Sequence, residues 1–372
     1  MSVRCQTVTS LIEKFAPKNL AEDWDSIGLQ VGNPAQEITG VLVTLDVNHD
    51  VLSEALLLGA NLIVSHHPVI FKPLKNLRLD LPQGQMMAEL IKNDIAVYCA
   101  HTNLDSAREG VNQVLAELLE LQDIQVLNAD KSEKLFKIVV FIPESHTNAV
   151  REAMTKAGAG WIGNYSDCTF SVQGMGTFKA SEGCNPFLGE IGVLEKAAEV
   201  RLETIVRENH LNKVIRSMIQ AHPYEEVAYD IYQLANAGTG YGLGRIGRLP
   251  QKVKLAQFME KVKKALCVNA LRFGGDTEAD VEKVALCGGS GSKFIHKASF
   301  AGADVFLTGD VKYHEAQQAL ELGLNFVDAG HFATEIPVVG KLAQWLRDAL
   351  IQDGLSLPVH ISRTNCDVIS YF

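Results

Sequence analysis

The chain has 372 residues, which is enough for two or three domains and a large core. Hydrophobic residues make up 47% of it and charged residues 21%, as in ordinary soluble globular proteins, so extensive disorder is excluded. The formal net charge of -10 argues against a nucleic-acid-binding protein, because such proteins usually carry a basic face or a basic excess.

The cysteines and the N-terminus indicate the compartment. The seven cysteines are scattered and never spaced as C-x-x-C, which indicates reduced thiols and not a disulfide framework or a structural zinc site. The N-terminal segment contains Glu13 and Lys14 and lacks the apolar core of a signal peptide. No uncharged apolar run approaches the length that spans a membrane. We therefore expect a cytoplasmic protein that has no membrane partner.

Strands and helices alternate in the first 129 residues, which predicts a layered, mostly parallel α/β sheet. The apolar runs that predict strands are 38–46, 62–65 and 95–100, and the helical patterns lie near 7–16, 50–58, 85–92 and 107–121. The same alternation returns in residues 241–372. There, a predicted strand precedes GGSGS (288–292), another ends at Asp310, and a third, LNFVDAG, precedes HFATE. We expect 1–129 and 241–372 to be the two halves of one α/β domain.

Residues 130–240 have a different character. Their predicted order is strand, helix, a pair of short strands around glycines, strand, helix and strand, which is typical of a ferredoxin-like α+β domain. The segments NADKSEK (128–134) and ANAGTGYGLG (235–244) are predicted to connect this inserted domain to the rest of the chain.

The stretch LIVSHHPVIF (62–71) carries the first candidate metal ligands. Its strand ends at His66 and His67, and ligands bind at the carboxyl ends of strands in open α/β sheets. Neighbouring side chains on extended backbone point to opposite sides, so the two histidines are able to serve two different ions. A histidine pair that only ends a strand is the alternative at this point.

Further candidate ligands follow other predicted strands. His331 and Glu335 are separated by four residues and share a helical face, although the helix dipole alone would favour Glu335 there. Asp105 follows the strand 95–100, where it could simply cap a helix that begins near Ser106. All five candidates stand beyond strand ends, which are expected to meet at one sheet edge. Three imidazoles and two carboxylates favour zinc, iron, manganese or nickel over calcium or magnesium. Five ligands fit two ions that share a bridging carboxylate.

Two other histidines and two glycine-rich segments are further candidates for a functional role. His101 and His314 are candidate catalytic acids or bases, with a loop histidine and a helix-surface histidine as the alternatives. GLGRIG (242–247) formally matches a dinucleotide motif but has no helix after it, so we interpret it as a connector. GGSGS is placed to cradle a phosphate, but a tight strand-to-helix turn is the favoured interpretation.

The segments SHHPVIF, AHTNLD, TGDVKYHEA, DAGHFATE and WDSIGLQVG occur in an order that resembles the Nif-three-like family, whose bacterial members are called GTP cyclohydrolase I type 2 homologues. This resemblance implies a dinuclear metal site with Glu335 as the bridging ligand. It also implies a toroidal hexamer, and it makes residues 130–240 similar to the PII and CutA-like inserted domain of the longer bacterial members.

Two functions follow as hypotheses. The first is a metal-dependent hydrolase that holds two divalent ions per subunit, zinc before iron, manganese or nickel, and uses activated water on a small anionic substrate. The resemblance alone names that substrate as GTP. The second is a non-catalytic, metal-binding regulatory ring in which the inserted domain senses a ligand.

Overall fold

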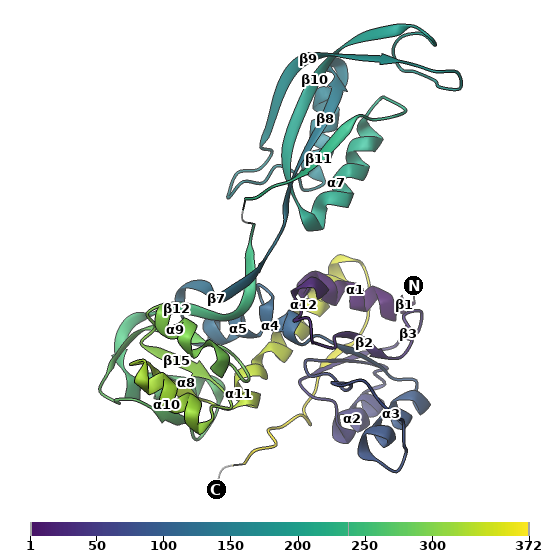
Figure 1. Ribbon diagram of the computed structural model, residues 1–372. Coiled ribbons are helices and arrows are strands. Elements are labelled where there is room, and N and C mark those ends of the chain that lie inside the picture. Colours follow the sequence, from purple (N-terminus) through teal and green to yellow (C-terminus); the bar gives the residue numbers. More distant parts are fainter. Residues whose placement is uncertain (1, 237, 371–372) are drawn as a thin grey trace. The chain divides into compact units, whose positions relative to one another are not determined.

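The computed structural model describes residues 2–236 and 238–370 (Figure 1). Ala237, in the predicted connection 235–244, lies outside the described residues. The chain forms two compact units. The first combines Met1–Lys131 with Tyr241–Phe372, and the second is Ser132–Gly240.

A five-stranded sheet in the first unit holds the N-terminal strands. Its order is β17 (Val359–Ile361), β4 (Val41–Thr44), β5 (Leu62–Ser65), β6 (Ala96–Cys99) and β2 (Gly28–Val31). The first four strands run parallel, and β2 is antiparallel to β6. Every residue of β4, β5 and β6 is buried, as expected for strands that are covered on both faces.

Helices cover both faces of this sheet, because alternate side chains of its strands enter different apolar clusters. Val41, Val43 and Val64 pack with α1 (Cys5–Phe15) and α12 (Pro337–Gln352). Leu42 and Ile63 pack with α2 (His49–Leu58) and α3 (Pro82–Lys92). The small sheet of β1 (Val3–Arg4) and β3 (Glu37–Ile38) adds to the α1 side.

A six-stranded sheet in the same unit holds the C-terminal strands. Its order is β13 (Arg272–Gly274), β16 (Asn325–Asp328), β15 (Val305–Thr308), β14 (Asp280–Leu286), β12 (Gly240–Lys254) and β7 (Gln122–Ser132). The central strands β14, β15 and β16 are parallel, whereas β12 and β13 pair antiparallel with them. One face packs against α5 (Val111–Leu118) and α8 (Leu255–Leu266), and the other against α9 (Ile295–Phe300) and α10 (Tyr313–Glu321).

The predicted α/β class is confirmed, but the expectation of a single sheet edge is wrong. The two halves of the chain build separate sheets, and each sheet takes one strand from the other half: β17 in the first sheet and β7 in the second. The interpretation of GLGRIG as a connector is also wrong, because it lies inside β12. Glycine is required there, since a Cβ on Gly242 would stand 1.9 Å from the carbonyl oxygen of Asn128.

The second unit contains β8 (Leu135–Pro143), α6 (Thr147–Lys156), β9 (Thr169–Lys179), β10 (Leu194–Arg207), α7 (Glu208–Ala221) and β11 (Tyr229–Gln233). Its antiparallel sheet has the order β11-β8-β10-β9, and α6 and α7 pack on it through one apolar cluster. The predicted pair of short strands around Gly174 and Gly176 is wrong. The whole segment is the single strand β9, which pairs with β10 without interruption.

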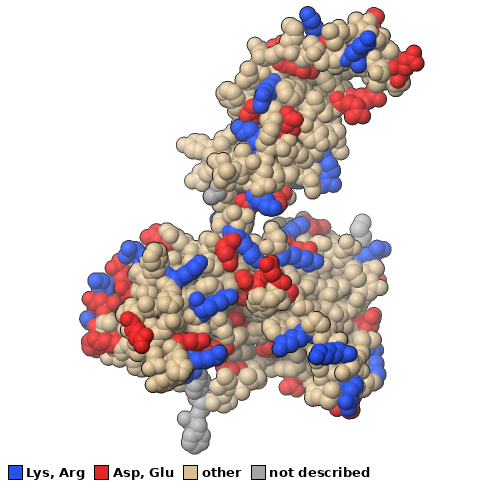
Figure 2. Space-filling view, viewed as in Figure 1, with Lys and Arg blue, Asp and Glu red and all other residues tan. Residues whose placement is uncertain are grey.

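The surface carries both signs of charge. On the face shown in Figure 2, Lys and Arg are interspersed with Asp and Glu, and the described residues form no continuous basic area there. In the part of the chain that the structure describes, every helix is too short or too polar to cross a lipid bilayer.

Candidate metal centre

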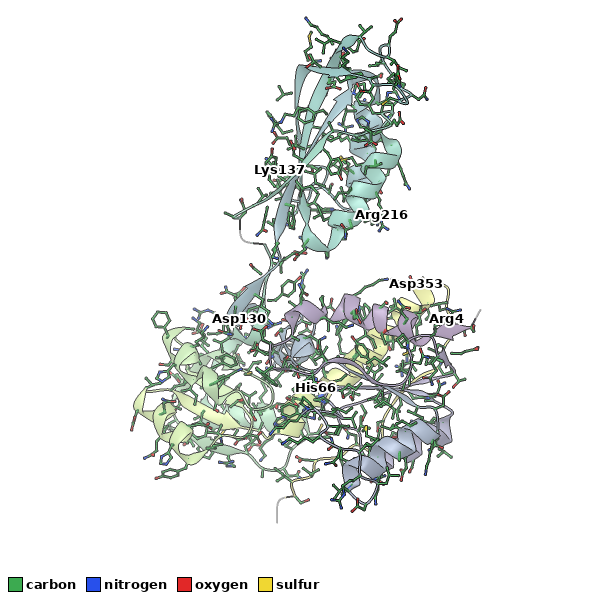
Figure 3. All side chains as sticks on the ribbon, turned by 45° about the vertical axis from the view of Figure 1, so that its right-hand side comes forward. Arg4, His66, Asp130, Lys137, Arg216 and Asp353 are labelled. Atoms are coloured by element: carbon green, nitrogen blue, oxygen red, sulfur yellow. The ribbon has the colours of Figure 1, made fainter. Side chains whose placement is uncertain are left out.

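The predicted ligands follow the carboxyl ends of parallel strands in both sheets of the first unit. His66 and His67 come directly after β5, and Asp105 lies in α4 (Thr102–Ser106), which follows β6. His331 and Glu335 are the first and last residues of α11 (His331–Glu335), which follows β16. Figure 3 shows His66 inside this unit. The predicted ligands that follow strands of the two sheets therefore lie at one site.

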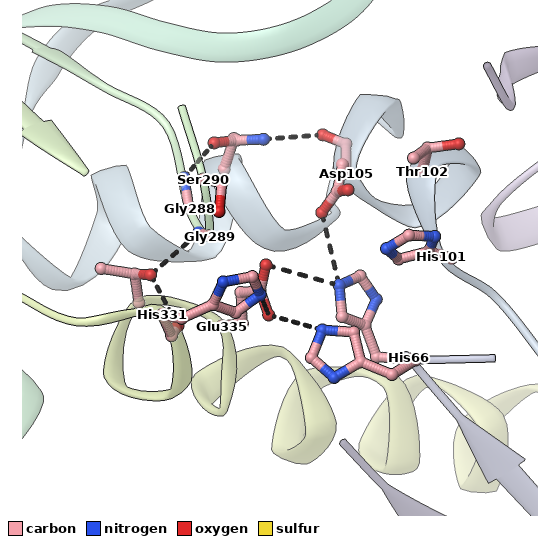
Figure 4. A network of polar contacts seen from close by, with 12 residues as sticks. His66, His101, Thr102, Asp105, Gly288, Gly289, Ser290, His331 and Glu335 are labelled. Carbon is pink, nitrogen blue, oxygen red and sulfur yellow. Dashed lines mark hydrogen bonds and ion pairs between the residues drawn. The ribbon is translucent and has the colours of Figure 1, made fainter. Parts of the chain in front are cut away.

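The ligand atoms of all five predicted residues lie close together (Figure 4). Nε2 of His66 is 3.6 Å from Oδ1 of Asp105 and 3.8 Å from Oε1 of Glu335. The other carboxylate oxygen, Oε2 of Glu335, is 3.0 Å from Nε2 of His67 and 3.1 Å from Nε2 of His331. Each oxygen of Glu335 therefore faces a different set of partners.

These separations suit ligands that share a cation. Ligands around a tetrahedral zinc ion lie at about 2.0 to 2.2 Å from it, and hence roughly 3 to 4 Å from one another. Nε2 of His66 and Oδ1 of Asp105 are buried and have no hydrogen-bond partner in the structure. Because unpaired polar atoms are costly inside a protein, a bound ion would satisfy both. The donor set therefore fits a metal ion.

The other ring nitrogen of each histidine in the cluster is held by the protein. The Nδ1 contacts are His66 to the carbonyl of Ala100 at 2.9 Å, His67 to Asp46 at 2.8 Å, His101 to Asp25 at 2.9 Å and His331 to Asp310 at 2.6 Å. An acceptor at Nδ1 fixes the tautomer and leaves Nε2 free to act as a ligand. The rings are therefore already oriented for metal binding.

The carboxylates of the cluster favour the charged form of the histidines beside them. Burial opposes the charged form of His67, but its contacts with Asp46 and Glu335 outweigh this and raise its pKa to about 10. The Glu335 contact, against opposing burial, raises the pKa of His331 to about 9. Burial would raise the pKa of Glu335, yet its histidine contacts hold that pKa well below its usual value. A potential that attracts protons to these rings also favours a metal cation.

Burial decreases from one end of the cluster to the other. His66 and Glu335 are almost fully buried, whereas the side chain of His331 is 36% exposed and that of His67 is 24% exposed. The cluster is therefore open to solvent on the side of His67 and His331.

His101 lies in the cluster, whereas His314 does not. His101 forms a close group of ligand atoms with His66 and His67, so it is a candidate ligand as well as a candidate acid or base. His314 is exposed on α10 and contacts Gln317, and none of the three metal-type groups found among the described residues includes it. Asp105 lies within α4 instead of capping a helix at Ser106.

The loop GGSGS packs directly against the cluster (Figure 4). The amide of Gly288 donates to Asn112, that of Gly289 to Thr334 and that of Gly291 to Thr308, each at 2.9 Å. Amides that already have protein acceptors are not available to a phosphate. The loop is therefore the tight strand-to-helix turn that the sequence favoured.

Sequence reasoning assigned no role to the residues that support the ligands. Asp46 and Asp310 follow β4 and β15, and they contact His67 and His331. Their position just after a strand was a signal in the sequence, as it was for the predicted ligands. Trp24 and Phe71, both largely exposed, lie beside the cluster. The ring centroid of Trp24 is 6.0 Å from that of Phe71 and 6.1 Å from that of His101.

Comparisons with known proteins identify relatives over almost the whole chain. The family model Duf34/NIF3 (NGG1p interacting factor 3) matches residues 3–367. Proteins named GTP cyclohydrolase 1 type 2 homolog are similar: that of Halalkalibacterium halodurans is 49% identical over 92% of this chain and 93% of its own, and that of Bacillus subtilis is 48% identical over 98% of each.

Solved structures agree with this assignment. A Bacillus cereus protein related to NIF3 is 45% identical, covers both chains completely and has a TM-score of 0.95. A Staphylococcus aureus protein is 29% identical, covers 100% of this chain and 99% of its own, and has a TM-score of 0.77. The predicted family is confirmed: the chain belongs to the Duf34/NIF3 family.

Proposed function

We propose that this protein is a metal-dependent hydrolase whose centre holds two divalent ions bridged by Glu335. The observation that carries the proposal is that the two oxygens of the Glu335 carboxylate face different residues. Oε1 faces His66, which also contacts Asp105, whereas Oε2 faces His67 and His331. Each oxygen therefore completes a separate group of three protein ligands.

The two ligand sets differ in composition and exposure. The buried set is His66, Asp105 and Glu335, and the more exposed set is His67, His331 and Glu335. Three protein ligands leave open positions for water or substrate, as in catalytic metal sites. Imidazole with carboxylate suits zinc first, with iron, manganese or nickel as the alternatives.

When bound, two divalent ions would attract an anionic substrate and lower the pKa of a coordinated water. The residues of the chain supply orientation and proton handling. Asp25 accepts a hydrogen bond from Nδ1 of His101, which directs Nε2 of His101 to the side of the cluster where His66 and His67 lie. We propose that His101 exchanges a proton with the substrate or with water at this position.

The substrate class that we propose is an anionic, nucleotide-like molecule. The relatives are named for GTP cyclohydrolase 1 type 2, and Trp24 with Phe71 gives this chain an exposed aromatic surface beside His101. An aromatic ring stacks on a base for about 1 to 3 kcal/mol.

Trp24→Ala is expected to raise the KM for such a substrate about tenfold with little change in kcat. Trp161→Ala, which removes an exposed tryptophan of the second unit, is the matched control and should leave KM unchanged. An unchanged KM in Trp24→Ala would remove this aromatic surface from the proposal.

The dinuclear hydrolase is tested by measuring metal content and turnover together. Elemental analysis with native mass is expected to give two ions per chain for the wild type and one for His67→Ala, which keeps the buried ligand set. Turnover of GTP to a ring-opened or formylated product should be lost in His67→Ala and kept in His296→Ala, which removes an exposed histidine on α9. His314→Ala tests separately whether that exposed residue contributes. Two bound ions without turnover on a nucleotide panel would leave a metal-binding protein and refute the hydrolase.

We propose that 132–240 is an inserted, ferredoxin-like domain of the PII and CutA-like type, supported by its strand and helix order and its β11-β8-β10-β9 sheet. We also propose that the chain forms a homohexamer and works in the cytoplasm. Native mass spectrometry measures the subunit number, and a monomer would refute the ring.

A further inference from the structure

The second unit contains a cavity of about 370 Å³ that is separate from the metal cluster. It is formed by β8, β9 and β10, by the loop between β9 and β10, and by the segment that precedes β11. Its main lining residues are Phe141, Phe178, Phe187, Tyr224, Glu199 and Glu225. Only residues of this unit line the cavity, so it does not depend on how the two units are placed.

Aromatic rings form much of the wall. The ring centroid of Tyr224 lies 6.0 Å from that of Phe178 and 6.2 Å from that of Phe187. The three residues come from a strand and two different loops. Rings at these separations are in tilted or edge-to-face contact, so the three side chains form a continuous aromatic wall on which an apolar or cationic group can pack.

The wall of the cavity also contains a carboxylate that has no counter-ion among the described residues. Glu199 on β10 is only 9% exposed, and its Oε1 accepts a hydrogen bond of 2.9 Å from the hydroxyl of Tyr224. Gly176 leaves space for the other oxygen, because a Cβ there would lie 2.1 Å from Oε2. Among the described residues Glu199 forms no ion pair, and no Lys or Arg lines the cavity. A buried carboxylate with no cation beside it is costly, which indicates that the cation comes from a ligand.

The nearby His222 does not supply that charge. Its Nε2 donates to the carbonyl of Phe141 at 3.0 Å, and its Nδ1 accepts from the amide of Tyr224 at 3.1 Å. One donating and one accepting ring nitrogen define the neutral tautomer. Burial also lowers the pKa of His222, in keeping with a neutral ring. Its role is to hold the segment that carries Tyr224.

We propose that this cavity binds a small organic cation, with its ammonium group against Glu199 and its apolar body packed against the aromatic wall of Phe178, Phe187 and Tyr224. Aromatic rings next to carboxylates are the usual recognition chemistry for ammonium groups. Glu225 and Glu226 add negative charge at the same cavity, so anions such as nucleotides are disfavoured. The site requires no metal and does not rest on the proposed hydrolase.

Three probes that share a phenyl ring and differ in charge test the proposal on the full chain: phenethylamine, 2-phenylethanol and phenylacetate. By isothermal titration calorimetry near neutral pH, the protonated amine is expected to bind about tenfold more tightly than the alcohol, and the carboxylate not at all. Prior treatment with a chelator should leave this order unchanged.

Glu199→Gln keeps the shape of the side chain and removes its charge, so the preference for the amine over the alcohol should fall to about twofold or less. Tyr224→Phe, which removes the hydroxyl that positions Glu199, should weaken amine binding as well. Glu203→Gln is the matched control, because Glu203 also lies on β10 but pairs with Lys137 and Arg201 outside the cavity. Equal binding of amine and alcohol, tighter binding of phenylacetate, an unchanged preference in a folded Glu199→Gln, or no saturation by the amine up to about 10 mM would each overturn the proposal.

Discussion

Glu335→Gln is expected to release both metal ions, with an affinity loss of more than about 100-fold at each position. The amide oxygen keeps the volume of the side chain but removes the charge that both ligand sets share. Loss of a supporting residue around a metal typically costs 10 to 100-fold in affinity, so loss of a ligand shared by two ions should exceed that range. Turnover should fall below detection. The metal content of dialysed protein, measured by elemental analysis, checks the first expectation.

Thermal unfolding separates loss of metal from loss of fold. A ligand that binds only the native state stabilises it by RT ln(1 + L/Kd), where L is the free ligand concentration, so a chelator should lower the Tm of the metal-loaded wild type. The same chelator should leave the Tm of Glu335→Gln unchanged. Glu321→Gln, the same change at the exposed end of α10, is the control and should behave like the wild type. If Glu335→Gln retained two ions, a bridging role for this carboxylate would be excluded.

The cluster of candidate ligands was predictable because the signal of its residues is local. His66 and His67 interrupt an apolar strand, and a strand that ends in a metal-type side chain is visible in the sequence. Strand ends in α/β proteins gather at one side, so side chains that are far apart in sequence become candidates for one site. That argument joined His66 to Glu335 across the second unit, and the two side chains lie 3.8 Å apart, although they follow strands of two different sheets and not of one.

The arrangement of the sheets was not predictable in the same way. The strand β17 pairs with β4, and β7 lies beside β12, so each sheet contains one strand from the distant half of the chain. Apolar periodicity identifies a strand but does not say which partner it takes, because pairing is decided by packing over the whole unit. The prediction of parallel strands was correct for the central strands of both sheets, but the prediction of one sheet instead of two was wrong.

His101 shows where residue type stops being informative. In the sequence it is one histidine four residues before Asp105, and a residue that supports a ligand, a proton shuttle and a loop residue are about equally compatible with it. Its position is decided by Asp25, which reaches both its ring and the amide of Thr102 from a loop 76 residues earlier in the chain. A contact between residues so far apart in the chain produces no periodic pattern in a single sequence.

The glycines of GGSGS could be assigned to a turn from the sequence, but only the structure shows what they touch. Gly289 has a φ of +61°, and a Cβ there would stand 2.2 Å from Oε1 of Glu335. That distance is far inside van der Waals contact, so the carboxylate would have to move. Gly289 therefore sets the position of the oxygen that faces His66, although it offers no ligand atom itself.

Gly289→Ala is expected to weaken metal binding at least about tenfold, because the displaced carboxylate no longer meets both ligand sets. The left-handed backbone also costs an alanine on the order of 1 kcal/mol of unfolding free energy. Gly302→Ala separates the two effects. Gly302 has a φ of +71° in the same unit, but a Cβ there would meet nothing within 4 Å. Gly302→Ala should therefore show the cost of the left-handed backbone alone in metal-free urea unfolding, Gly289→Ala should lose at least as much stability, and only Gly289→Ala should lose metal affinity in a competition titration. Equal metal affinity in the two variants would mean that the carboxylate of Glu335 is free to relax and that Gly289 serves the turn alone.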